Sequence, residues 1–210
     1  YKANRKEKYA EQTPQEEKEF AMFMAEFSNT LTLLKEKYPV FQFKGVEADD
    51  IAAYISMNLD KYGLDECWMV SSDKDWDLLI NDRVSRFSTV TRKETTVHNW
   101  DEHYDFDIPD YITFKCLTGD KGDNVPGIPG IGPKRAVQLM EQYGDVFDIY
   151  NACPIDGKYK YIQNLNENAE QLLTNVELMD LITYSETAIG EENTEVINTT
   201  LLRHLDENRL

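Results

Sequence analysis

The sequence predicts an α/β fold that continues into a helical C-terminal region. Two short segments, the apolar Cys67 to Val70 and the mixed Val84 to Ser88, have the length of strands and alternate with helical patterns. After Ala136 the apolar residues recur at helical spacing almost to the end of the 210-residue chain. Hydrophobic residues make up 41% of the chain and aromatic residues 11%, which predicts a folded core.

Composition narrows the classes of function. A formal net charge of −17 argues against nucleic-acid binding, because phosphate contacts require Lys and Arg. If many of the acids gather around metal ions, however, their charge is neutralised locally and a DNA-facing surface can still be basic. The charge therefore predicts poor DNA binding without metal. No apolar run approaches the ~18 residues of a membrane helix, and we expect neither a membrane span nor a secretory signal.

The first nine residues, YKANRKEKY, are basic with interleaved aromatics. Such a run is most often a solvated helix face or a tail. Alternatively, its cations contact a nucleic-acid backbone while its rings stack on bases. No initiator methionine precedes Tyr1, and we expect that upstream material is missing.

A helix is predicted to begin at Thr13, which caps it, with Pro14 at the first helical position and Glu16 completing a capping box. It should end before Pro39, and a short strand over Val40 to Phe43 should follow. The apolar residues of this helix recur at helical spacing and are expected to face the core: Phe20, Phe23, Met24, Phe27, Leu31 and Leu34.

The middle of the chain is predicted to hold a β-hairpin and a further helix. Val84 to Ser88 and Thr95 to His98 should form the two strands, around a turn at Thr91 to Lys93. Pro109 to Leu117 reads as a helix that leads into a glycine-rich stretch.

Two groups of acids are placed where α/β proteins often form sites. Glu47, Asp49 and Asp50 open a helix directly after the predicted strand. Asp73 and Asp75 follow the strand that ends at Val70, and ligands bind at the carboxyl ends of strands in open α/β sheets. The alternatives are ordinary ones, since acids complement the dipole of a first helical turn or cap a helix.

The stretch Gly119 to Ala136, GDKGDNVPGIPGIGPKRA, joins two kinds of chemistry. Asp120 and Asp123 are spaced to offer carboxylates to a metal. The glycine hairpin then enters a helix at Pro133, a frame that presents backbone N–H groups to a phosphate. Alone, such a hairpin usually marks only a turn, so the assignment depends on the other acids. The hairpin glycines and the cations beside them are candidate DNA contacts: Gly127, Gly130, Gly132, Lys134 and Arg135.

The strand-end and loop acids together suggest a metal site with oxygen ligands only. Neither the three histidines nor the three widely spaced cysteines complete a zinc pattern. Oxygen ligands favour Mg²⁺ or Mn²⁺, and so many carboxylates in one place favour two or more ions. Two such ions about 4 Å apart can activate water and stabilise a leaving oxygen of a phosphodiester. The candidate ligands are Glu47, Asp49, Asp50, Asp73, Asp75, Asp120 and Asp123.

Three motifs in this order, VEADD, SSDKDWD and GDKGDNVPGIPGIGPKRA, closely resemble the flap endonuclease (5′-nuclease) family, above all the phage 5′-exonucleases. The resemblance extends from YKANR through KYIQNLN and covers most of the chain. It implies a PIN-like α/β sheet flanked by helices, followed by a helical DNA-binding region with a helix–hairpin–helix. The implied division is a partial nuclease domain over residues 1–118, including part of the helical arch, and a helical domain over residues 119–210.

The resemblance also implies roles for individual residues. Glu47 and Asp49 match carboxylates of the first metal site, with Asp50 beside them. Asp73, Asp75 and Asp123 match the second site, and Asp120 matches a nearby outer acid. The segment from Gly127 to Lys134 matches the element that grips duplex DNA, which in the family often binds K⁺ through backbone carbonyls. Tyr1, Lys2 and Arg5 match the base of the arch, where a lysine and an arginine contact the scissile phosphate.

The implied activity is Mg²⁺-dependent hydrolysis of DNA at 5′ flaps and 5′ ends, with Mn²⁺ as a substitute, by a viral protein in the cytoplasm of a bacterial host. One departure is that the family's first strand, two further aspartates and about half of the arch have no counterpart in this chain. Either the chain is a fragment of a longer protein or a separate N-terminal segment completes the site, and the chain alone should be impaired. The alternatives are a DNA-binding module without catalysis and a PIN-like nuclease of RNA, which the hairpin disfavours.

Overall fold

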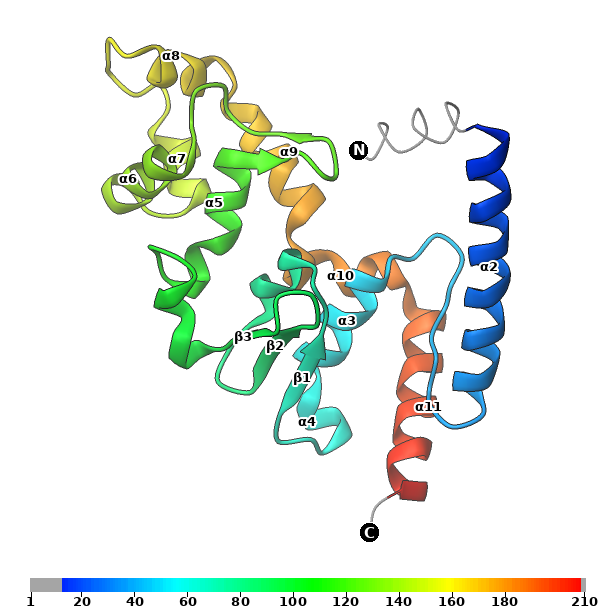
Figure 1. The fold of residues 1–210 in the computed structure, drawn as a ribbon. Coiled ribbons are helices and arrows are strands. Elements are labelled where there is room, and N and C mark those ends of the chain that lie inside the picture. The colour runs from blue at the N-terminus through cyan, green and yellow to red at the C-terminus, as the bar shows by residue number, and fades with distance from the viewer. Residues whose placement is uncertain (1–12, 209–210) are drawn as a thin grey trace.

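The computed structural model describes residues 13–208 (Figure 1). Its main sheet has three strands in the order β1–β2–β3, with β1 parallel to β2 and β2 antiparallel to β3. A two-stranded antiparallel sheet, β4–β5, lies in the glycine-rich stretch. The strands are β1 Cys67–Val70, β2 Val84–Ser88, β3 Lys93–Thr95, β4 Gly119–Asp120 and β5 Val125–Pro126.

Helices make up most of the described chain. Short 3-10 helices follow β1 and β3 and precede α5: η1 Lys74–Leu79, η2 Val97–Glu102 and η3 Ile108–Asp110. The α-helices are α2 Pro14–Lys35, α3 Ala48–Met57, α4 Leu59–Tyr62, α5 Tyr111–Thr118, α6 Pro133–Tyr143, α7 Val146–Ala152, α8 Lys160–Glu167, α9 Ala169–Met179, α10 Leu181–Ile189 and α11 Glu191–Asn208. None of the helices in this part of the chain is both long and apolar enough to cross a bilayer.

The strands flanking the acids were predicted more accurately than their neighbours. β1 and β2 have the predicted bounds. The predicted hairpin is confirmed by the antiparallel pairing of β2 with β3. Its second strand is Lys93–Thr95 and not Thr95 to His98, because the Thr96 hydroxyl accepts from the His98 N–H and starts a 3-10 helix. The predicted strand from Val40 to Phe43 is wrong. Within residues 13–208 this segment has no ladder partner, and Phe41 and Phe43 instead stack on each other at 6.3 Å.

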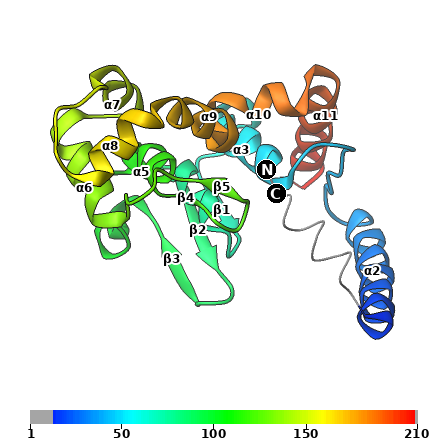
Figure 2. The ribbon, with the colours of Figure 1, turned by 90° about the horizontal axis from the view of Figure 1, so that it is seen from above.

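Helix α2 begins as predicted, but its environment differs from the prediction. Thr13 and Glu16 form the capping box. The apolar stripe does not face a core, since α2 has no buried residue and Phe23 is 61% exposed. Figures 1 and 2 show α2 along one side of the described fold, with α6, α7 and α8 on the opposite side. Helical spacing predicts an apolar face, but it does not identify the element that covers that face.

Three hydrophobic clusters hold the rest of the described fold together. One packs α5 to α9 around fully buried residues such as Leu117, Leu165 and Leu172. A second packs the main sheet against α3, α4 and η1, around Leu79 and Val84. The third joins α3 to α10 and α11 through Ile51, Ile189 and Ile197. The C-terminal helices therefore cover the helix that carries the first group of acids.

Helix α5, predicted over Pro109 to Leu117, leads directly into the loop that carries the third group of acids. A Cβ on Gly119 would lie 2.2 Å from the Gly127 nitrogen, so the two ends of the β4–β5 hairpin cross too closely for a side chain. The buried Asn175 of α9 donates to the Cys116 carbonyl at 2.9 Å and to the Pro126 carbonyl at 2.8 Å. These contacts fix both ends of the loop that bears Asp120 and Asp123.

Candidate metal centre and nucleic-acid interface

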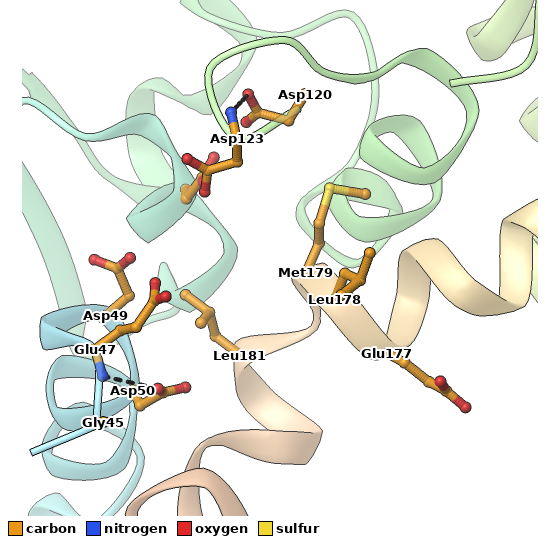
Figure 3. Close-up of a pocket in the computed structure, with 11 residues that line it drawn as sticks. Gly45, Glu47, Asp49, Asp50, Asp120, Asp123, Glu177, Leu178, Met179 and Leu181 are labelled. Carbon is orange, nitrogen blue, oxygen red and sulfur yellow. Dashed lines mark hydrogen bonds between the residues drawn. The ribbon is translucent and has the colours of Figure 1, made fainter. Parts of the chain in front are cut away.

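The predicted acids converge from three separate segments onto one cleft of about 250 Å³. Figure 3 shows Glu47 and Asp49 on one side of this opening, Asp123 and Asp120 on another, and Leu181 beside them. Six of the seven predicted ligands line it: Glu47, Asp49, Asp50, Asp75, Asp120 and Asp123.

The first group lies at the start of α3. Glu47 is the N-cap residue, and Asp50 Oδ2 accepts from the Glu47 N–H at 3.4 Å. Asp49 Oδ1 accepts from the indole Nε1 of Trp76 at 2.8 Å. Capping thus orients two of these acids, and a side chain from the next acid-bearing segment orients the third.

The second group follows β1, and its two members differ in position. Asp73 is exposed and caps η1, accepting from the Asp75 N–H at 3.0 Å, and it is not among the residues that line the cleft. Asp75 is half-buried and lines the cleft. The Tyr111 hydroxyl donates to the Lys74 carbonyl at 2.8 Å, so α5 anchors the backbone between the two acids.

A buried ion pair supports the segment between β1 and η1. The Asp77 and Arg86 side chains are 1% and 6% exposed, and Arg86 Nη2 donates to Asp77 Oδ2 at 2.9 Å. Tyr104 donates its hydroxyl to the same carboxylate. Arg86 also donates to the Ser71 carbonyl at 3.1 Å, so this pair fixes the backbone just ahead of Asp73.

The third group lies in the loop between β4 and β5. Asp120 Oδ1 accepts from the Gly122 N–H at 2.7 Å and from the Asp123 N–H at 3.2 Å. Residue Asn124 has a φ of +59°, a conformation that asparagine tolerates better than most residues. The loop thereby turns tightly enough for Asp120 and Asp123 to line the same cleft.

Lys115 of α5 connects the second and third groups. Its ammonium donates to Asp75 Oδ1 at 2.6 Å and to Asp120 Oδ2. Burial raises the pKa of Asp75, and the charges of Asp73 and Asp120 raise it further against the effect of Lys115. Burial opposes ionisation of Asp120, but hydrogen bonds from Lys115 and from two backbone N–H groups outweigh it and lower that pKa. Burial also opposes the charge on Lys115, yet its two carboxylate partners raise its pKa.

The donor set fits a hard divalent cation. All the charged side chains that line the cleft are carboxylates, and carboxylate oxygens are the ligands that Mg²⁺ and Mn²⁺ prefer. Within residues 13–208, no three His, Cys, Asp or Glu side chains already surround a common point as they do around a bound metal. The carboxylates are therefore gathered along one cleft and not around a single point.

Three residues near these acids were not predicted from sequence. Glu177 of α9 lines the same cleft, although Figure 3 shows its carboxylate pointing away from the aspartates. Trp76 and Lys115 contact predicted ligands directly. Lys115 carried a weak signal, since a lysine on the helix that leads into an acidic loop is placed to reach it. Glu177 lies within a helix and carried none.

The glycine hairpin enters α6 as predicted, with Gly132 as N-cap and Pro133 first. Gly130 has a φ of +86°, which disfavours other residues. A Cβ on Gly132 would meet nothing within 4 Å, so this side of the hairpin is open. In contrast, a Cβ on Gly127 would lie 2.3 Å from the Thr118 backbone, which gives Gly127 a role within the fold.

The two cations of α6 have different surroundings. Arg135 donates to the Gly130 carbonyl at 2.6 Å and stacks 4.5 Å from the centre of the Tyr161 ring, so it braces the hairpin. Lys134 is exposed in the first turn of α6. The predicted contacts at Tyr1, Lys2 and Arg5 lie outside the residues that the structure describes.

Known proteins that are similar to this chain include nucleases of one family. A family model described as "5′-3′ exonuclease, C-terminal SAM fold" matches residues 107–200. The flap endonuclease of Escherichia phage T5 is 42% identical over 199 residues, which are 94% of this chain and 68% of that protein. A 5′-3′ exonuclease of Halalkalibacterium halodurans is 31% identical over 160 residues, and the match covers 73% of this chain and 53% of that protein.

A solved structure extends the likeness to three dimensions. The phage T5 flap endonuclease, crystallised as a pseudo-enzyme–product complex with DNA and metal ions, matches with a TM-score of 0.90 and 39% identity. The match covers 98% of this chain and 77% of that one. The family expected from the three motifs is confirmed: this chain belongs to the flap endonuclease and 5′-3′ exonuclease family.

Proposed function

We propose that this chain carries the metal-binding and duplex-binding parts of a Mg²⁺-dependent, structure-specific 5′-nuclease. It hydrolyses DNA at 5′ flaps and 5′ ends of duplexes, in the cytoplasm of an infected bacterial host. The observation that supports this most is the convergence of carboxylates from the α3 start, the β1 end and the β4–β5 loop on one cleft. Six acids from these three segments on a single cleft are far more than capping or solubility requires.

The proposed ligands divide into two sets. Glu47 and Asp49, with Asp50 beside them, hold one ion, while Asp75 and Asp123, with Asp73 and Asp120 nearby, hold the other. Bound Mg²⁺ or Mn²⁺ supplies an activated water and stabilises the leaving oxygen of a phosphodiester. The protein's own contribution is to hold these acids on three separate segments around one cleft, which Met179 and Leu181 line with apolar side chains.

The DNA contacts in this proposal lie on two regions. Gly130, Gly132 and the first turn of α6 present backbone N–H groups and Lys134 to a duplex phosphate, with K⁺ as a second ligand of the hairpin. Lys2 and Arg5 contact the scissile phosphate, and Tyr1 stacks on a base of the single strand. We assign the nuclease part to residues 1–118 and the duplex-binding part to residues 119–210. This division is one of function and not of packing, because the cluster that joins α5 to α9 also contains Cys116 and Leu117.

We propose further that an N-terminal segment of the family fold completes the site. The chain spans 68% of the phage flap endonuclease and 53% of the Halalkalibacterium exonuclease. Among the described residues, β1 is an edge strand, with Trp68 47% and Val70 64% exposed. An added strand would cover this edge, because an exposed apolar edge is otherwise a site of association.

A cleavage assay tests the proposal. A labelled 5′-flap DNA is incubated with Mg²⁺ or Mn²⁺ and the chain, alone and after addition of the preceding segment of the family fold. Metal-dependent cleavage that is lost in Asp75→Asn supports a nuclease, and cleavage only in the mixture supports the added segment. Duplex binding without cleavage in either sample would instead identify a non-catalytic DNA-binding module.

A further inference from the structure

Lys115 is buried at the position where two of the three acid groups meet. Its side chain is 14% exposed, and lysines are almost never buried unless they are paired. Its partners come from different segments, since Asp75 is 40 residues before it and Asp120 is five residues after it. The ammonium thus already supplies a positive charge to two carboxylates that line the cleft.

Lys115 lies on α5 and is not among the residues that line the cleft. It therefore contacts these carboxylates from behind the cleft wall. It engages one oxygen of each acid, Asp75 Oδ1 and Asp120 Oδ2. The other oxygen of Asp120 accepts from two backbone N–H groups of its own loop. Both oxygens of Asp120 therefore have protein donors, and one of these donors is the positively charged ammonium.

We propose that Lys115 is an internal cation that competes with a divalent ion for Asp75 and Asp120, and so sets the metal concentration at which this half of the site fills. The inference rests on the proposed function, because it requires an ion to bind these carboxylates. Two observations support competition. Asp75 and Asp120 are both already held by the ammonium. A unit positive charge a few ångströms from a divalent ion also repels it strongly.

The fold does not depend on this lysine to place the loop. Asn175 holds both ends of the loop, and the backbone N–H groups of Gly122 and Asp123 orient Asp120. Cys116 and Leu117, the next residues of α5, are fully buried and anchor the helix. The flexible four-carbon stem of Lys115 can therefore release its carboxylates without rearranging α5.

The test is the affinity for Mn²⁺ alone, measured by titration calorimetry on the whole chain with Lys115→Met, Lys115→Arg and Lys121→Met. Lys121 lies in the loop that bears Asp120 and Asp123 and is exposed, so Lys121→Met removes the same net charge from a position open to solvent. Lys115→Met should bind Mn²⁺ about tenfold more tightly than the unmodified chain, whereas Lys121→Met and Lys115→Arg should change the affinity less than about twofold. Lys115→Gln, which keeps a hydrogen-bond donor without charge, is the second variant if Lys115→Met does not fold.

The outcomes separate this inference from the proposed function. If Asp75→Asn binds Mn²⁺ as well as the unmodified chain, the cleft is not the metal site and both ideas fail. If Asp75→Asn loses binding but Lys115→Met and Lys115→Gln bind no more tightly than the unmodified chain, the site stands and the competition is refuted. Weaker binding in both Lys115 variants would also overturn the inference, because it would show that the ammonium helps to assemble the site.

Discussion

The indole N–H of Trp76 donates to the Asp49 carboxylate at 2.8 Å, joining two acid-bearing segments that are 27 residues apart in sequence. Trp76 follows Asp75 directly, so one dipeptide supplies a proposed metal ligand and also orients another on α3. Hydrogen bonds of this kind to a ligand commonly change metal affinity or activity 10- to 100-fold. The relationship explains how residues from η1 and α3 come to share one cleft.

Replacing Trp76 with Phe should lower the affinity for Mn²⁺ about tenfold while the fold is kept, because the ring remains and only the donor is lost. The control is Trp68→Phe, which changes an exposed tryptophan of β1 that does not line the cleft. Titration calorimetry with Mn²⁺ measures both. Equal affinities in the two variants would show that the Trp76 hydrogen bond does not orient Asp49.

Asp75→Asn should lower the rate of flap cleavage at least ~100-fold, since it removes charge from a proposed ligand and weakens stabilisation of the transition state by several kcal/mol. Duplex binding should change little, because the hairpin is a separate contact. Cleavage is measured under single-turnover conditions, and binding by fluorescence anisotropy. Asp82→Asn, at an exposed position outside the cleft, is the matched control. Unchanged cleavage in Asp75→Asn would exclude this carboxylate from the site.

Lys134→Ala should weaken duplex binding similarly for all sequences and reduce the slope of log K against log salt by about 1, as loss of one phosphate contact does. The measurement is anisotropy over a salt series in the Asp75→Asn background, which prevents cleavage. Lys93→Ala, on β3 of the main sheet, serves as the control. A slope that stays the same in Lys134→Ala would show that this lysine does not contact DNA.

Asp77→Ala should destabilise the fold by about 3–5 kcal/mol, because it leaves the Arg86 guanidinium buried without its carboxylate. Urea denaturation followed by circular dichroism measures this change. The double replacement of Asp77 by Leu and Arg86 by Met should recover part of the loss, since no charge then remains buried. A cost below about 1 kcal/mol for Asp77→Ala would mean that water reaches Arg86.

The candidate site was predictable because its parts are local in sequence. Acids directly after β1 and at the start of α3, and a glycine hairpin before Pro133, each have a short-range signature. The cap at Thr13 and the bounds of β1 were predictable for the same reason. The order of the motifs suggested that these acids lie close together. Only the three-dimensional structure shows that six of them line one cleft.

The parts that sequence did not reveal depend on long-range contacts. The donors to Asp49 and Asp75, Trp76 and Lys115, lie 27 and 40 residues away from those acids. The exposure of the Phe20, Phe23 and Phe27 face of α2 depends on which element covers it, and periodicity does not carry that information. Val40 to Phe43 has the residues of a strand, but no partner among the described residues pairs with it.

The central claim is that carboxylates from three segments hold divalent ions in one cleft. Anomalous diffraction at the manganese edge, from crystals of the chain grown with Mn²⁺, tests it most directly. We expect one peak bound by Asp75 and Asp123 and a second beside Glu47 and Asp49, with the first lost in Asp75→Asn. A well-ordered structure with no anomalous peak in this cleft, or with peaks only elsewhere, would contradict it.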